Sequence, residues 1–234
     1  MLEIISAKPI KENEIGENNV FELKRNTPKQ ITKDNNVHVA YIHEDTENEH
    51  LFIHSAFDDN EFAVICNEFA LNFLKDPKRV DLSYYFFSET NQVTVFLYDM
   101  KKTFAGIDVL IHLVEQWKSS IDDAEYCIKK LSDYGNYEIA DIFIGVITED
   151  NDEERRNKEI ASLSSPDSTE PNIPSFIKSK HLANTADNIM KANLLKGLDE
   201  GRITISGKIY SVDVRVFIDK RYDLYFERGR LSTT

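Results

Sequence analysis

The chain has 234 residues, of which 41% are hydrophobic and 29% charged, so it holds enough apolar material to bury a core. This composition excludes a wholly disordered chain. Acidic residues outnumber basic ones by 41 to 28, and the formal net charge is −13. A protein that binds DNA through its overall charge needs an excess of lysine and arginine to neutralise the phosphates. The negative net charge therefore excludes this mode of DNA binding. A DNA-binding function would need a local site, metal ions or a basic partner to offset the repulsion.

The N-terminal third predicts a lead-in followed by a hairpin and a helix. Residues 1–36 are rich in Lys, Glu and Asn, and they predict a mobile lead-in with one short strand. Apolar segments at 37–42 and 51–57 predict two strands, with the polar residues between them as the hairpin loop. An Asp-Asp-Asn sequence then supplies a helix N-cap signal, and apolar residues at helical spacing predict a helix over 61–74.

The middle of the chain carries the clearest patterns. Residues 81–87 and 93–100 are rich in aromatic and β-branched side chains, and they predict a second hairpin. Alternating three- and four-residue apolar spacing predicts a long amphipathic helix over 107–131. Such a helix either covers one face of a sheet or packs against a partner protein, as in a coiled coil. A nearly continuous apolar run at 139–148 predicts a strand buried on both faces.

The composition changes after the apolar run, where charged residues, Ser and Pro predict an acidic linker over 149–175. A helix is predicted over 175–198. A glycine stands at the expected position after the end of this helix. The chain then predicts a hairpin made of 202–205 and 210–218, and one further strand at 222–226.

The order of these elements predicts an α/β (α+β) fold in which helices flank a mixed central β-sheet. Residues 1–36 form the lead-in, residues 37–148 the core and residues 149–175 the linker. We expect the C-terminal helix and β-hairpin, residues 176–234, to extend the core and to pack on it.

Targeting and cysteine usage predict a cytoplasmic protein. The first twenty residues lack the apolar segment of a secretory signal, and no stretch is apolar enough to cross a membrane. Cys66 and Cys127 lie in apolar patterns of helical spacing, and neither has a second ligand at zinc-binding spacing. We therefore expect two buried free thiols in a reducing compartment.

One group of residues points to chemistry. Asp81 begins one predicted strand, and Asp99 and Lys101 end the next. Because side chains alternate along a strand, Asp99 and Lys101 face the same way, and the hairpin brings Asp81 to the same sheet edge. Two carboxylates there offer hard oxygen ligands to Mg²⁺ or Mn²⁺, which would polarise a phosphate and lower the pKa of an attacking water. The lysine would orient or deprotonate that water and stabilise charge on the phosphate.

These residues resemble the PD-(D/E)xK nuclease superfamily, which has the restriction-endonuclease-like fold. The resemblance rests on Asp81 and on the Asp99-Met100-Lys101 sequence, and it extends over about residues 60–148. It implies that an acidic residue at the start of one strand and a (D/E)xK on the next bind the catalytic metal. It also implies a helix that packs on the sheet after the second strand, followed by another strand.

Two further positions match features of some members of that superfamily. Glu68 matches an acidic metal ligand contributed by the preceding helix, and Gln116 matches a glutamine on the following helix. The sequence departs from the usual pattern at Val80, where proline is expected, and at Asp99, where Glu is commoner. An alternative without chemistry is that Asp99 and Lys101 belong to a solvated charge cluster at a strand end.

The resemblance implies a Mg²⁺- or Mn²⁺-dependent endonuclease, a hydrolase that cleaves DNA. Because the chain is acidic, we expect it to act as a subunit of a larger complex in which a protein partner delivers the DNA, and we expect no membrane contact. Bacterial antiviral defence and restriction systems often use such nucleases. Self-association into a homo-oligomer is a further possibility.

Two other functions are consistent with the sequence. The first is a non-catalytic acidic adaptor, including an inactive nuclease fold, that binds a protein partner through the 107–131 helix. The second is an acidic inhibitor that mimics the charge of DNA, which would require carboxylates at phosphate-like spacing over one surface. Metal-dependent cleavage distinguishes the nuclease from both alternatives.

Overall fold

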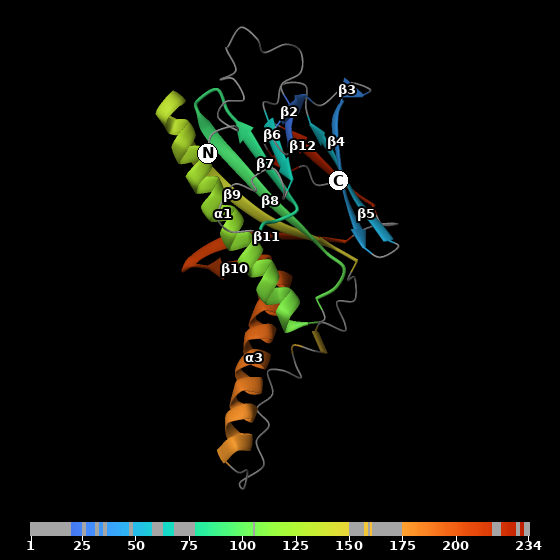
Figure 1. Ribbon diagram of the computed structural model, residues 1–234, viewed down its shortest axis with the longest axis vertical. Coiled ribbons are helices and arrows are strands. Elements are labelled where there is room, and N and C mark those ends of the chain that lie inside the picture. Colours follow the sequence, from blue (N-terminus) through green and yellow to red (C-terminus); the bar gives the residue numbers. More distant parts are fainter. Residues whose placement is uncertain are drawn as a thin grey trace.

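Two β-sheets and two long helices form three layers in the described part of the chain (Figure 1). The computed structural model describes residues 20–24, 27–30, 33–34, 37–46, 49–57, 63–67, 78–104, 106–149, 157–158, 160, 175–216, 221–227 and 230–231. The arrangement is a mixed α/β (α+β) fold, as the order of the apolar segments predicts.

The larger sheet contains both parallel and antiparallel strand pairs. Within the described residues its strand order is β10-β11-β9-β8-β7-β6-β1-β2. The strands are β1 (Val20–Lys24), β2 (Thr27–Gln30), β6 (Ala63–Asn67), β7 (Leu82–Phe87), β8 (Gln92–Lys101), β9 (Glu138–Thr148), β10 (Arg202–Ile205) and β11 (Lys208–Val216). β7 and β8 form an antiparallel hairpin, whereas β8, β9 and β11 run parallel. The carboxyl ends of these three parallel strands and the start of β7 therefore lie at one edge of the sheet.

The smaller sheet has the strand order β13-β12-β5-β4-β3 among the described residues. The strands are β3 (Lys33–Asp34), β4 (Val37–Thr46), β5 (Glu49–Phe57), β12 (Arg221–Glu227) and β13 (Arg230–Leu231). β4 and β5 form the predicted first hairpin, and β12 joins it by pairing in parallel with β5. The smaller sheet thus combines strands from opposite ends of the chain.

Helix α1 (Ile107–Gly135) covers one face of the larger sheet, running along β8 and β9 (Figure 1). Its apolar side is buried at Leu110, Leu113, Trp117, Ile121, Ala124 and Ile128. The three- and four-residue spacing predicts this stripe except at Leu113, which is buried where Val114 is expected, and the stripe packs into the core of its own chain. The stripe is therefore not available for a coiled-coil contact with another protein.

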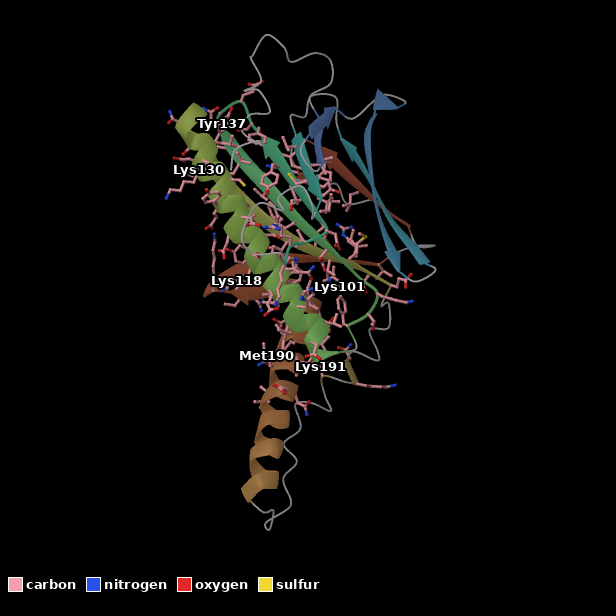
Figure 2. All side chains as sticks on the ribbon, in the orientation of Figure 1. Lys101, Lys118, Lys130, Tyr137, Met190 and Lys191 are labelled. Carbon is pink, nitrogen blue, oxygen red and sulfur yellow. The ribbon has the colours of Figure 1, made fainter. Side chains whose placement is uncertain are left out.

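Helix α3 (Ser175–Asp199) contacts α1, β10 and β11 and extends away from the two sheets (Figure 1). Leu195 and Leu198, near its carboxyl end, are buried in the same core as α1. Ile189 and Met190, farther from that end, are 50% and 43% exposed, and Figure 2 shows Met190 on the part of α3 that leaves the body. Among the side chains of α3 that the structure describes, only those of its last turns are thus packed against the core.

An aromatic cluster fills the space between the two sheets. Three aromatic rings of the β7–β8 hairpin contact Phe226 of β12. Their centroids lie 4.7 Å (Tyr84), 4.9 Å (Phe86) and 5.3 Å (Phe96) from the centroid of the Phe226 ring. The strands of the β7–β8 hairpin are therefore buried on both faces, by α1 on one side and by the smaller sheet on the other. Double burial explains why both strands are rich in aromatic and β-branched residues.

The helix predicted over residues 61–74 is wrong over residues 63–67, which form strand β6. The Ala-Val-Ile-Cys sequence is continuously apolar, and such a short run suits a buried strand as well as a helix. β6 pairs in parallel with β1 and antiparallel with β7, so both of its edges are hydrogen-bonded. Ala63 and Ile65 face the smaller sheet while Cys66 faces α1, which is the alternation of a strand.

Other differences concern the ends and exposure of elements. One short strand is predicted in residues 1–36, but the structure has β1, β2 and β3 there, and the first two extend the larger sheet. β9 is buried over its last five residues, whereas its first six are exposed or half-buried, so it is not buried throughout. Most of the predicted linker, residues 149–175, lies outside the described residues. The division into domains stays a prediction.

The raised pKa values of the two cysteine thiols predict how the free energy of unfolding changes with pH. Burial raises the pKa of the Cys66 thiol far above its ordinary value of 9.0, and burial and the Asp123 charge raise that of Cys127 to about 12. The unfolded chain therefore releases thiol protons near pH 9 while the folded chain keeps them, so the free energy of unfolding falls as pH rises above 9. Each pH unit should cost about 1.4 kcal/mol for Cys66 alone.

Urea denaturation at pH 7.5 and at pH 10 measures this loss. Cys66→Ala should remove most of its share of the pH dependence, because alanine has no proton to release. A wild-type unfolding free energy that does not fall over this range would contradict the prediction.

Candidate functional site

The β7–β8 hairpin brings the three predicted site residues together. Leu82 lies opposite Tyr98 in the antiparallel register, which places the preceding Asp81 opposite Asp99. The Met100 N–H donates a hydrogen bond to Asp81 Oδ2 over 2.6 Å. Asp81 and Asp99 thus meet where β7 begins and β8 ends, although they are eighteen residues apart in the sequence.

Asp99 is the buried centre of this group, with no exposed surface. Its Oδ1 accepts a hydrogen bond from Gln116 Nε2 over 2.9 Å. Its Oδ2 forms an ion pair with the Lys101 ammonium. The three side chains therefore form one polar network beneath α1, and the interpretation of Asp99 and Lys101 as a solvated charge cluster is wrong for Asp99.

The electrostatics of Asp99 combine opposing effects. Burial raises the pKa of Asp99 above the ordinary value of a carboxyl, because the charged form loses its hydration. The Lys101 ammonium opposes that rise, as do the contacts of Asp99 with the carboxyl group and the backbone N–H of Asp81. The carboxyl groups of Asp81 and Asp99 are thus in direct contact, and a nearby positive charge favours the ionised form of Asp99.

Lys101 links this buried network to the surface. Its side chain is 16% exposed, and its Nζ lies 3.4 Å from the Met100 carbonyl oxygen. Figure 2 shows Lys101 at the end of the larger sheet, near the first half of α1. In β9 the residue opposite Lys101 is Thr148, which is fully buried. An ammonium in this position is able to contact a group at the sheet edge while it remains beside Asp99.

Gln116 joins the site from α1, at the position that the resemblance indicates. Its Nε2 donates to the Arg79 carbonyl oxygen over 2.8 Å as well as to Asp99. Its Oε1 is buried and has no hydrogen-bond partner among the described residues. The side chain is only 6% exposed, so Gln116 is neither a solvent-facing residue nor a fully satisfied one.

Residues just before Asp81 are also tied to α1. The Val80 N–H donates to Ser120 Oγ over 3.0 Å, and Arg79 Nε donates to Asp123 Oδ2 over 2.7 Å. The sequence did not reveal these contacts, since each joins residues 40 or more apart. The only available signal was the polar spacing of Gln116, Ser120 and Asp123, which runs beside the apolar stripe.

The donor atoms of the site suit a hard divalent cation in kind. Carboxylate oxygens of Asp81 and Asp99 and the Met100 carbonyl oxygen are the ligand type that Mg²⁺ and Mn²⁺ prefer. In the described part of the chain, no three acidic, His or Cys side chains come together in one cluster. Glu68, the third predicted ligand, lies outside the described residues. The structure thus provides a pair of carboxylates.

The remaining observations concern the described helices, a basic residue of β11 and the comparisons with known proteins. Neither described helix combines the length and apolar character that a membrane crossing requires. The basic residue Arg215, at the end of β11, is paired with Asp213, which also accepts a hydrogen bond from Tyr98. No known family model, no curated protein and no solved structure matches this chain.

Proposed function

We propose that this chain is a Mg²⁺- or Mn²⁺-dependent nuclease of the restriction-endonuclease-like fold that cleaves DNA. The carboxylates of Asp81 and Asp99 hold the metal, with Glu68 as a third ligand, and Lys101 acts beside them. One observation carries the proposal: Asp81 contacts both Asp99 and the Met100 amide at the meeting point of β7 and β8. A fully buried carboxylate beside a second, half-buried one is costly, so their convergence calls for a function.

The order of elements around these residues supports the same proposal. β7 and β8 are followed by α1, which packs on the sheet, and then by β9, which pairs in parallel with β8. This is the order of strands and helix that the resemblance implies. Gln116 of α1, at a helix position where some members of the superfamily carry a glutamine, bonds to Asp99. A chance Asp-x-Lys sequence would not bring these additional features with it.

Each residue of the proposed site has a distinct role. A bound divalent ion would polarise the scissile phosphate and lower the pKa of the attacking water. Asp81 and Asp99 supply negative charge and oxygen ligands at a fixed separation, which the Met100 and Gln116 hydrogen bonds maintain. Lys101, which is partly exposed, stabilises the negative charge that develops on the phosphate.

DNA must approach the site against a net charge of −13. Repulsion of this kind weakens association with a polyanion, since long-range attraction requires an excess of positive charge. We therefore propose that the chain acts as a subunit of a bacterial defence or restriction-type complex, in which a basic partner holds the DNA. In the presence of that partner, cleavage should then be stronger at low ionic strength than at high ionic strength, whereas cleavage by the isolated chain should show no such gain at low ionic strength.

The second candidate is a non-catalytic interaction subunit with the same fold. It is favoured by the complete burial of Asp99, because a carboxylate without exposed surface leaves little room for a phosphate. Such a subunit would not bind its partner through the apolar face of α1, which is buried in its own core. The two candidates differ in whether the carboxylate pair binds a metal.

Two measurements test the proposal. Supercoiled plasmid and linear DNA, incubated with the chain and Mg²⁺ or Mn²⁺, should be cut, and EDTA should stop the reaction. Binding of Mn²⁺, followed by calorimetry or electron paramagnetic resonance, should occur without any partner protein. A folded chain that neither binds Mn²⁺ nor cuts DNA contradicts the nuclease proposal and supports the interaction subunit.

A further inference from the structure

The Arg79–Val80 peptide group is held by α1 at both of its polar ends. Its carbonyl oxygen accepts a hydrogen bond from Gln116 Nε2 over 2.8 Å, and its N–H donates to Ser120 Oγ over 3.0 Å. Gln116 and Ser120 are four residues apart in the helix, so they lie on one face in successive turns. With its donor and its acceptor both bonded, this peptide group cannot rotate without breaking a buried hydrogen bond.

Asp123 adds a third contact from the same face of α1, one turn beyond Ser120. Its Oδ2 accepts a hydrogen bond from Arg79 Nε over 2.7 Å, and the two side chains are 13% and 6% exposed. Because the pair is largely shielded from water, its attraction is screened less than that of a surface ion pair. Gln116, Ser120 and Asp123 together are called the α1 clamp below.

The α1 clamp acts on the two residues directly before Asp81, whose carboxylate is bonded to the Met100 amide. A change in the orientation of the Arg79–Val80 peptide would move the next Cα, and with it the Asp81 carboxylate. We propose that Ser120 and Asp123 are positioning residues, which hold the Arg79–Val80 peptide so that the Asp81 carboxylate faces Asp99 and Met100.

The Arg79–Asp123 pair is poorly explained as a simple source of stability. Arg79 Nη2 is buried and has no hydrogen-bond partner among the described residues, which costs free energy. A buried ion pair is often replaceable by apolar residues of similar size without loss of stability. What apolar residues would not reproduce is the direction that an arginine–carboxylate contact imposes on the backbone. Positional control accounts for a charged pair at this place.

The amide proton of Met100 reports the position of Asp81 without any assay of activity. The chain has three methionines, so selective ¹⁵N-methionine labelling gives few signals, and Met100→Leu identifies the one needed. Asp81→Asn replaces the charged acceptor by a neutral one and should move this signal upfield, which sets the reference shift. We expect Ser120→Ala to cause at least half of that upfield shift, and the Arg79→Met, Asp123→Leu double replacement to do the same.

Ser119 provides a matched control. It is buried next to Ser120, with exposures of 6% and 4%, but its Oγ has no hydrogen-bond partner in the described part of the chain. Ser119→Ala should therefore leave the Met100 signal at its wild-type position. Ser120→Thr, which keeps the hydroxyl group, should also leave the signal close to that position. Circular dichroism and thermal denaturation check that each variant is folded. A Met100 signal that stays unmoved in folded Ser120→Ala and in the double replacement overturns the proposal.

The α1 clamp determines the position of Asp81. The effect of that position on metal affinity rests on the proposed function. If that function holds, Ser120→Ala should weaken Mn²⁺ binding about tenfold or more, as the loss of a residue that orients a ligand does. A wild-type chain that binds no Mn²⁺ would contradict the proposed function alone, and the Met100 signal would still decide on the α1 clamp. An unmoved Met100 signal in a chain that binds Mn²⁺ would contradict the clamp alone.

Discussion

Asp99→Asn is expected to abolish metal-dependent DNA cleavage, with a reduction of about a thousandfold or more. Loss of a charged metal ligand removes several kcal/mol of transition-state stabilisation, and about 4 kcal/mol corresponds to a thousandfold in rate. Asparagine keeps the size of the side chain and an oxygen that is able to accept the Gln116 hydrogen bond. The variant should thus lose the negative charge while the surrounding fold is retained.

Asp122→Asn is the matched control, because Asp122 is an exposed carboxylate on α1, away from the buried network. Its cleavage rate and Mn²⁺ affinity should equal those of the wild type. Plasmid cleavage and Mn²⁺ titration of the two variants, with thermal denaturation to check folding, provide the comparison. Undiminished cleavage by folded Asp99→Asn would show that any observed activity comes from another site or from a contaminant.

Trp117→Ala is expected to reduce the free energy of unfolding by about 3–5 kcal/mol, the usual cost of removing a large buried aromatic side chain. Trp117 has no exposed surface and lies in the centre of the apolar stripe of α1. Its indole N–H also donates to the Gly145 carbonyl oxygen over 3.1 Å, so the replacement leaves a buried acceptor without this partner. Urea denaturation at pH 7.5 measures the loss.

Tyr126→Ala on the same helix is the control for this prediction. Tyr126 is 43% exposed, and the Lys130 ammonium lies over its ring at 5.7 Å from the centroid. Its removal should change the free energy of unfolding by no more than about 0.5 kcal/mol, as is usual for surface replacements. Equal losses for the two variants would mean that α1 does not anchor the core through its Trp117 face.

Gly145 shows how closely the core around this contact is packed. A Cβ atom added at Gly145 would overlap the ring of Tyr98, which lies on the opposite face of the sheet from α1. The backbone of β9 therefore carries two close contacts at one residue, with Tyr98 on one side and the Trp117 N–H on the other. A glycine in a strand interior often marks such a close approach.

Much of the fold follows from local patterns in the sequence. The β7–β8 hairpin, α1 and α3 agree with the predicted elements to within a few residues, because periodicity and turn residues act over short distances. β6 is different, since its apolar run is compatible with a helix or a strand. Pairing with β1 on one edge and with β7 on the other decides that it is a strand.

The candidate site divides in the same way. Asp81, Asp99 and Lys101 come together because the hairpin and the two-residue period of a strand bring them to one edge, and both are visible in the sequence. The contacts of Arg79 and Val80 with Asp123 and Ser120 join residues 44 and 40 apart, so no local pattern contains them. The catalytic and metal-binding roles of Asp81, Asp99 and Lys101 stay predictions.

By itself, the sequence determined the elements with strong periodicity and the placement of two carboxylates and a lysine at one hairpin end. The tertiary structure alone decided that Asp99 is buried, that the apolar face of α1 packs against its own sheet, and that α1 holds the peptide before Asp81. The reason is physical. Burial and hydrogen bonding between distant residues depend on which surfaces meet in the folded chain, whereas strand and helix periodicity depend on neighbouring residues alone.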